Sequence, residues 1–246
     1  MAEPARVLVI GAGGLGCASG LALARAGLEL VITFVDPDRV EESNLHRQVL
    51  YDRADIGRPK AVRAAERVQQ DARSRGTALG TRALEDRFAP GNAAALVRDH
   101  DLVIEGTDRH ESKFLAAVAC VLGGVPVVHA GIVRWSGWAM ATLPHRSACL
   151  RCVFEDVPAD ASIETCSESG VVGPAVGTIG ALEAMLAARL LAGEHDVAGM
   201  LLRYDALAGT ARSTRARRRE GCALCGTSRT IRDLREERYA APACAT

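Results

Sequence analysis

The chain of 246 residues lacks net charge, because its 30 basic side chains balance its 30 acidic ones. A chain without a charge excess has no bulk attraction for nucleic acid or for an anionic membrane. One basic cluster, formed by Arg215, Arg217, Arg218 and Arg219, has no aromatic residues beside it on which nucleic-acid bases could stack. We interpret this cluster as a solvated strand end and expect no nucleic-acid partner.

A secretory signal is also not expected, since the segment 1–6 is short and polar. The apolar run after it is typical of a core strand. Residues 171–193 are apolar enough to resemble a membrane span, but Pro174, Glu183 and Arg189 interrupt them. We therefore expect a buried helix in this segment, no membrane association and a cytoplasmic protein.

The eight cysteines do not indicate disulfides, because a cytoplasmic chain keeps its thiols reduced. Four of them form two Cys-x-x-Cys pairs, Cys149 with Cys152 and Cys222 with Cys225. Two such pairs match a tetrahedral zinc site with four thiolate ligands, which has no open position and is therefore structural. The long gap between the pairs means that the metal would join two distant parts of one fold. Four unrelated cysteines, or an iron or iron–sulfur site, are the alternatives.

A glycine motif directly follows the first predicted strand. Residues 7–10 form a short apolar run that is typical of a strand buried on both faces of a parallel sheet. Gly11, Gly13 and Gly16 have the G-x-G-x-x-G spacing, which lets backbone N–H groups at a helix N-terminus approach a phosphate. A second apolar run ends at Asp36, where a partner for ribose hydroxyls is expected. These features indicate a nucleotide-binding unit without distinguishing NAD from another nucleotide.

Predicted strands and helices alternate over the first 130 residues. Further strands are expected at 30–35, 101–105 and 125–129, and a helix at 110–123 with Leu122 facing inward. This alternation predicts an α/β fold with a doubly wound, mostly parallel sheet of the Rossmann type.

The alternation ends after residue 130. A hairpin, a long apolar helix and two late strands are expected at 135–138, 173–192, 201–205 and 211–217. We interpret this part as an antiparallel extension that the four-cysteine zinc site pins to the fold. The expected organisation is one domain over 1–229, with a nucleotide-binding half at 1–130 and a second half at 131–229, followed by a polar tail at 230–246.

Ligands of such sheets bind beyond the carboxyl ends of the strands. The glycine motif, Asp36 and Asp108 each follow a strand directly, so we expect them to converge on one crevice. Arg47 and Lys60, in and beside a long polar loop, are suited to bind phosphate, and the Asp108 carboxylate is suited to hold Mg²⁺. Each of these residues taken alone could be an ordinary surface charge.

Cys166 lies in a polar stretch before the apolar helix. A thiol near a helix N-terminus can have a lowered pKa and act as a nucleophile. Glu164 and Glu168 beside it work against such a lowering, and a plain loop cysteine is the alternative.

Several segments in a fixed order carry a resemblance to a known family. They are G-A-G-G-L-G-C, V-D-P-D-R-V-E-E-S-N-L-H-R-Q, D-I-G-R-P-K, Thr107-Asp108, the two Cys-x-x-Cys pairs and T-C-S-E-S-G-V-V-G-P. From about Arg6 to Cys225 the chain resembles the ThiF/MoeB/HesA group, bacterial relatives of ubiquitin-activating enzymes. The resemblance implies ATP with Mg²⁺ in place of NAD.

In that group the C-terminal carboxylate of a small β-grasp carrier protein ending in Gly-Gly attacks the α-phosphate of ATP, and pyrophosphate leaves. The resemblance therefore implies an adenylyltransferase that activates a ubiquitin-like sulfur carrier, and a homodimer. Catalytic roles are implied for Arg47, Lys60, Asp108 and Cys166. Nucleotide-binding roles are implied for Gly11, Gly13, Gly14, Gly16, Asp36, Asp38, Asn44, Arg47, Gln48, Lys60 and Asp108.

Two departures from the family pattern bear on this activity. Only six residues precede the first strand, so the N-terminal arginine that members of the group supply to a partner subunit's ATP is expected to be absent. Arg109 stands where the group often has asparagine. No rhodanese-like domain is evident in the sequence, so a separate protein is expected to donate the sulfur. A non-catalytic nucleotide-binding scaffold subunit and an NAD-dependent oxidoreductase are the alternative functions.

Overall fold

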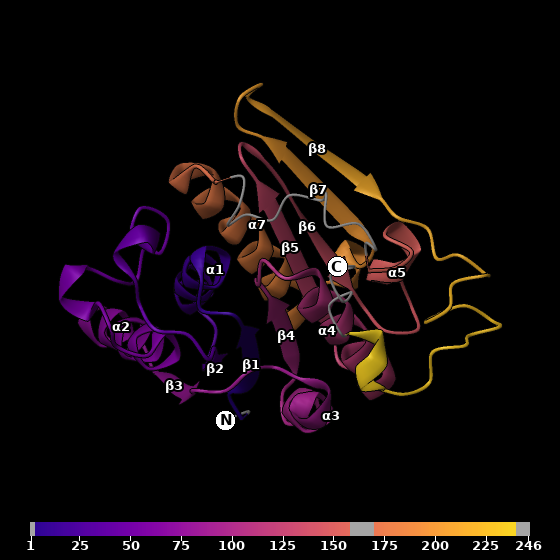
Figure 1. Ribbon diagram of the computed structural model, residues 1–246, viewed down its shortest axis with the longest axis horizontal. Coiled ribbons are helices and arrows are strands. Elements are labelled where there is room, and N and C mark those ends of the chain that lie inside the picture. Colours follow the sequence, from indigo (N-terminus) through magenta and orange to yellow (C-terminus); the bar gives the residue numbers. More distant parts are fainter. Residues whose placement is uncertain (1–2, 158–169, 240–246) are drawn as a thin grey trace, which may run out of the picture.

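A computed structural model describes residues 3–157 and 170–239, and in it helices cover both faces of one sheet (Figure 1). The strands are β1 (Ala5–Ile10), β2 (Leu30–Val35), β3 (Leu79–Leu84), β4 (Leu102–Glu105), β5 (Val127–Val133), β6 (Ser136–Thr142), β7 (Met200–Asp205) and β8 (Thr210–Arg215). The α-helices are α1 (Gly14–Ala24), α2 (Lys60–Ser74), α3 (Pro90–Arg98), α4 (His110–Gly123), α5 (Leu150–Val153) and α7 (Gly173–Leu191). Short 3-10 helices are η1 (Glu42–Asn44), η2 (Arg53–Asp55), η3 (His195–Val197) and η4 (Glu236–Arg238).

Within the described residues the sheet has eight strands in the order β3-β2-β1-β4-β5-β6-β7-β8. The five strands from β3 to β5 run parallel, whereas β6, β7 and β8 each pair antiparallel with the preceding strand. The order of the strands along the chain reverses between β1 and β4, which is where a doubly wound sheet opens a crevice at its carboxyl edge. The predicted doubly wound, mostly parallel sheet with an antiparallel extension is confirmed.

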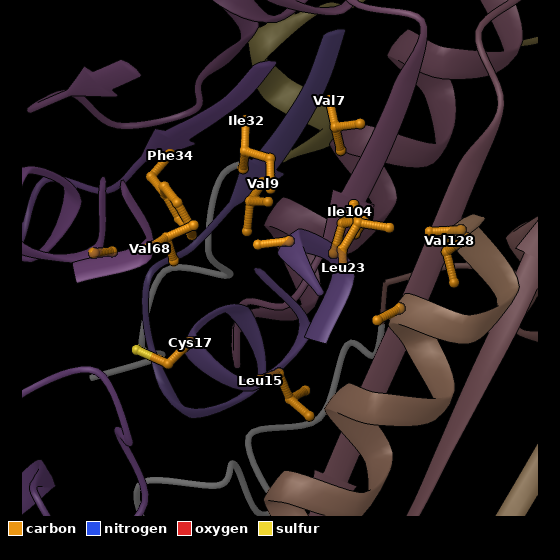
Figure 2. Packing of buried hydrophobic residues seen from close by; sticks show 14 of the residues in the cluster. Val7, Val9, Leu15, Cys17, Leu23, Ile32, Phe34, Val68, Ile104 and Val128 are labelled. Atoms are coloured by element: carbon orange, nitrogen blue, oxygen red, sulfur yellow. The ribbon is translucent and has the colours of Figure 1, made fainter. Parts of the chain in front are cut away.

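Alternate residues of β1 serve two separate cores. Val7 and Val9 pack with residues of α1, α2 and α7, while Leu8 and Ile10 pack with residues of α3 and α4 on the opposite face. Figure 2 shows the first of these cores, with Phe34 of β2 among the packed side chains. Because both faces are covered at this part of the strand, residues 7–10 are all apolar, whereas Arg6 near the start of β1 is exposed.

The apolar helix α7 packs inside the fold, as predicted. It lies against α1, β5 and β6, and its buried side includes Ile179, Leu186 and the wholly buried Glu183. By length and composition α7 could cross a membrane, but 50% of its most apolar window is buried within the structure. The core helix of a globular protein passes the same test, so α7 is weak evidence for a span.

Local details depart from the sequence predictions where tertiary packing decides them. Leu122, expected to face inward, is 39% exposed on the last turn of α4. The strand expected at 125–129 continues to Val133, because β6 pairs with it along its whole length. Ile231 and Tyr239, from the segment expected to be a polar tail, are buried in the core beside α4.

Candidate active site and cysteine cluster

The glycine turn places the N-terminus of α1 against the end of β1. Gly11 has a φ of +87°, a conformation that residues with side chains rarely adopt. A Cβ at Gly16 would lie 1.8 Å from the carbonyl oxygen of Gly11, so α1 can begin this close to the strand only because Gly16 has no side chain. The N-cap residue Gly13 offers no side-chain acceptor, and the first N–H groups of α1 are therefore available to an anion.

Asp36 lies beside this turn at the end of β2. Its Oδ2 accepts a hydrogen bond from the backbone N–H of Ala12 at 2.7 Å, and its Oδ1 accepts one from Asp38 at 2.8 Å. Burial raises the pKa of the Asp36 carboxyl, although these two N–H donors and Lys60 oppose the rise. The two hydrogen bonds thus fix the carboxylate against the glycine turn. Its remaining lone pairs can accept hydrogen bonds from the hydroxyl groups of a ligand.

Two cations, Arg47 and Lys60, also lie near the turn. The guanidinium of Arg47 donates to Oδ1 of Asn44 at 2.6 Å, which fixes it in the polar loop. Nζ of Lys60, in the first turn of α2, lies 3.2 Å from Oδ2 of Asp38. Lys60 is only 7% exposed, so its ammonium group is held in place beside the turn.

The predicted residues converge on one cavity of about 320 Å³ at the carboxyl edge of the sheet. Ten of the predicted nucleotide-binding residues line it, namely Gly11, Gly13, Gly14, Asp36, Asp38, Asn44, Arg47, Gln48, Lys60 and Asp108. Gly16 is the exception, because it packs beneath the turn and supports it from below.

Among the other residues that line the cavity, the sequence analysis assigned no binding role to Arg87, Phe88, Arg109 or Ser112. Arg109 and Ser112 belong to the N-cap and first turn of α4, directly after Asp108. Arg87 and Phe88 follow the end of β3. The same rule about the carboxyl ends of strands that singled out Asp36 would therefore have found all four.

Several polar groups in the cavity wall are available to a ligand. Within the described residues, the Asp108 carboxylate and the Arg87 guanidinium take part in no hydrogen bond or ion pair. Oε1 of Gln48 is buried and has no partner there either. The N-termini of α1 and α4 both open into the cavity, and each carries partial positive charge. A polyanion with a cation on the Asp108 side fits this arrangement.

The four cysteines of the two Cys-x-x-Cys pairs form a cluster that packs with the core on the α3 and α4 face of the sheet. All four Sγ atoms lie within 4.8 Å of one another, with Cys149 to Cys222 at 3.6 Å and Cys152 to Cys225 at 3.4 Å. Zn–S bonds of about 2.3 Å in a tetrahedron place the sulfurs roughly 3.8 Å apart. The backbone N–H of Arg219 also points at Sγ of Cys152 from 3.5 Å, as is common around a metal-bound thiolate. The donor set therefore fits a zinc ion.

The basic cluster at 215–219 is not simply a solvated strand end. The Arg218 guanidinium donates to the carbonyl oxygens of Cys225 and, at 3.1 Å, His145. Arg219 donates to the carbonyl oxygen of Arg151 at 2.7 Å. These side chains join the two cysteine pairs across the gap in sequence, a role that a charge pattern alone does not reveal.

The predicted nucleophile Cys166 lies outside the described residues. The described chain stops at residue 157 and resumes at residue 170, shortly before α7 begins at Gly173. Val171 and Val176, on either side of that beginning, line the cavity.

Comparisons with known proteins agree with this geometry. The sequence profile of the ThiF family matches residues 2–224. The chain is 33% identical over 231 residues to the "Adenylyltransferase and sulfurtransferase MOCS3" of Dictyostelium discoideum, covering 93% of this chain and 53% of that protein. It is 37% identical over 237 residues to the "Sulfur carrier protein adenylyltransferase" of Thermus thermophilus, covering 94% and 85%. The chain thus spans about half the length of the first relative, 53%, and most of the second.

Among solved structures, E. coli MccB superposes with a TM-score of 0.78 over 92% of this chain and 66% of that chain. The two sequences are 20% identical, so this likeness concerns the fold alone.

Proposed function

The chain belongs to the ThiF family, and on that premise we propose that it is an adenylyltransferase. It uses ATP to activate the C-terminal carboxylate of a small ubiquitin-like sulfur-carrier protein. One observation carries the proposal: the glycine turn, the cations Arg47 and Lys60 and the unpaired carboxylate of Asp108 line a single cavity. Hydride transfer to NAD would have no need of a carboxylate that is suited to hold Mg²⁺.

The reaction joins a carboxylate oxygen of the carrier to the α-phosphorus of ATP, while the bond from that phosphorus to the bridging oxygen breaks. The electron pair leaves with pyrophosphate, so no proton has to be removed from the nucleophile. Catalysis then consists mainly of positioning and of stabilising charge on the phosphates.

The residues of the cavity divide this work between them. Asp36 holds the ribose, and the N–H groups at the start of α1 face the phosphates. Arg47 and Lys60 bind phosphate oxygens, and Asn44 keeps Arg47 in position through its 2.6 Å hydrogen bond. Asp108 holds Mg²⁺, which would neutralise charge on the leaving pyrophosphate.

We also propose that a structural zinc ion is held by the four clustered cysteines, Cys149, Cys152, Cys222 and Cys225. Residues 1–130 bind the nucleotide and residues 131–229 the carrier, with 230–246 as a terminal extension. Cys166 is proposed as the nucleophile that can take over the activated carrier. We further propose a homodimer, a separate sulfur-donor protein and a cytoplasmic location, where ATP is abundant.

The test is exchange of labelled pyrophosphate into ATP by the purified protein with a carrier ending in Gly-Gly. Exchange that requires the carrier, and stops when its final carboxylate is converted to an amide, supports the proposal. ATP binding without exchange, whichever Gly-Gly carrier is added, contradicts it and favours the scaffold alternative. Binding of NADH in place of ATP would contradict it in favour of an oxidoreductase.

A further inference from the structure

A buried ion pair lies directly beneath the loop that carries Asp108. Glu105 is the last residue of β4 and is wholly buried, with 0% of its surface exposed. Its Oε2 lies 2.9 Å from Nζ of Lys113, a residue of α4 that is itself only 7% exposed. Nζ of Lys113 also donates to the carbonyl oxygen of Ala130 in β5. The pair therefore ties α4 to two neighbouring strands of the sheet.

The other carboxylate oxygen of Glu105 holds the loop itself. Oε1 accepts hydrogen bonds from the backbone N–H of Thr107 at 3.0 Å and from its hydroxyl at 2.5 Å. Burial alone would raise the pKa of Glu105, but Lys113 and His129 outweigh it and the pKa is lowered. The carboxylate is therefore charged and can accept from both donors of Thr107, the residue immediately before Asp108.

Thr107 also contacts the glycine turn. A Cβ added at Gly11 would lie 2.9 Å from Cγ2 of Thr107, so the two loops touch across the floor of the cavity. Thr107 is thus held by hydrogen bonds to Glu105 and by its contact with the glycine turn. Because Asp108 is the next residue, these contacts of Thr107 fix the position of Asp108 relative to the N–H groups at the start of α1.

A buried ion pair is a poor stabiliser compared with an apolar pair of the same shape, because both charges must be desolvated. Stability alone therefore does not explain why charged groups occupy this place. An apolar pair could fill the same volume, but it could not accept the hydrogen bonds that the N–H and the hydroxyl of Thr107 donate.

We propose that Glu105 and Lys113 are positioning residues that orient Asp108 through Thr107 for its metal ion. The inference rests on the proposed function, because it concerns the metal that accompanies ATP in the same cavity. If the pair had a purely structural role, its replacement would not change the affinity for ATP that is gained from Mg²⁺.

The double variant Glu105→Leu/Lys113→Met replaces the pair with apolar side chains of similar size. Its thermal unfolding and its binding of ATP, measured calorimetrically with Mg²⁺ and with EDTA, are compared with the unmodified protein. We expect nearly unchanged unfolding and nearly unchanged ATP binding in EDTA, but a loss of roughly tenfold or more in the affinity gained from Mg²⁺. If a stably folded double variant gains as much affinity for ATP from Mg²⁺ as the unmodified protein does, the inference is overturned.

A second set of variants decides the matter if the double variant fails to fold. Thr107→Val removes the hydroxyl donor and keeps the shape, Thr107→Ser keeps the donor, and Thr210→Val is a matched control on the exposed strand β8. We expect a several-fold loss of the Mg²⁺ gain in Thr107→Val only, with the serine variant close to wild type. If Mg²⁺ raises the affinity for ATP equally in all three variants, the inference is overturned. If the unmodified protein itself binds no ATP, the proposed function fails, and the inference fails with it.

Discussion

Nζ of Lys60 lies 3.2 Å from Oδ2 of Asp38, and this ion pair stands at the rim of the cavity between the glycine turn and α2. The ammonium group is nearly buried, whereas the Asp38 side chain is 61% exposed. Because an exposed carboxylate is well solvated, a phosphate can replace Asp38 as the ion-pair partner of Lys60. The ammonium group of Lys60 does not have to move for this exchange.

We therefore predict that Lys60→Met lowers kcat for pyrophosphate exchange by roughly a hundredfold or more, because removal of one preorganised donor costs that much. Arg73→Met, at the exposed end of the same helix and outside the cavity wall, is the matched control for the loss of a positive charge, and we expect it to retain most of the activity. Exchange kinetics over a range of ATP concentrations give kcat for both variants. Equal losses of kcat in the two variants would contradict this prediction.

A second prediction concerns Arg109, which the family pattern does not explain. Its side chain is 52% exposed and its Nε lies 3.8 Å from Glu111, a distance too long for a strong ion pair. It lines the cavity beside Asp108, at the N-terminus of α4. The guanidinium can therefore turn toward the β- and γ-phosphates of ATP.

Arg109→Ala should weaken ATP binding by about tenfold, which corresponds to the loss of one hydrogen bond to a charged group. AMP binding should be unaffected, because AMP lacks the two outer phosphates. Arg98→Ala, at the exposed end of α3 and outside the cavity wall, controls for the loss of a positive charge. Calorimetric titrations of both nucleotides into both variants provide the measurement. An equal loss for ATP and AMP would place Arg109 away from the outer phosphates.

The sequence predicts the parts of this site that follow strands, and misses the parts that depend on packing. Asp36 and Asp108 could be placed because the carboxyl ends of parallel strands share one edge. The 2.9 Å approach of Lys113 to Glu105 could not, since a charged residue in an amphipathic helix usually points to solvent. The contacts of Arg218 with backbone carbonyls likewise depend on how distant segments pack, so the basic cluster by itself predicts only a solvated strand end.

A third prediction follows from the cysteine cluster. Purified protein should contain close to one equivalent of zinc, measured by elemental analysis, and Cys222→Ser should lose it. A zinc ion held by the four cysteines would join α5 to the chain around residue 222, so its loss should lower the unfolding temperature by roughly ten degrees or more, since a metal site contributes folding free energy directly. Cys120→Ala, a buried free thiol outside the cluster, should keep the zinc. Iron in place of zinc, with the matching absorption, would contradict the assignment of the metal.

The final prediction concerns Glu183, which is wholly buried in α7. Both of its carboxyl oxygens lack a hydrogen-bond partner within the described residues. Burial, and after it the negative charge of Glu105, hold the pKa of Glu183 well above its usual range. The carboxyl is consequently protonated in the folded protein at pH values where the unfolded chain, with an ordinary pKa of about 4.3, has lost the proton.

Unfolding then releases a proton, so the free energy of unfolding falls as the pH rises above the ordinary pKa and continues to fall until the raised pKa is passed. The slope from this one group is about 1.4 kcal/mol per pH unit. Glu183→Gln cannot ionise and should match the wild type near pH 5 while being more stable at pH 7 and above. Urea unfolding of both proteins between pH 5 and 8 gives the comparison, with Glu29→Gln as an exposed control. Parallel pH profiles for wild type and Glu183→Gln would mean that the carboxyl ionises in the folded state at its ordinary pKa.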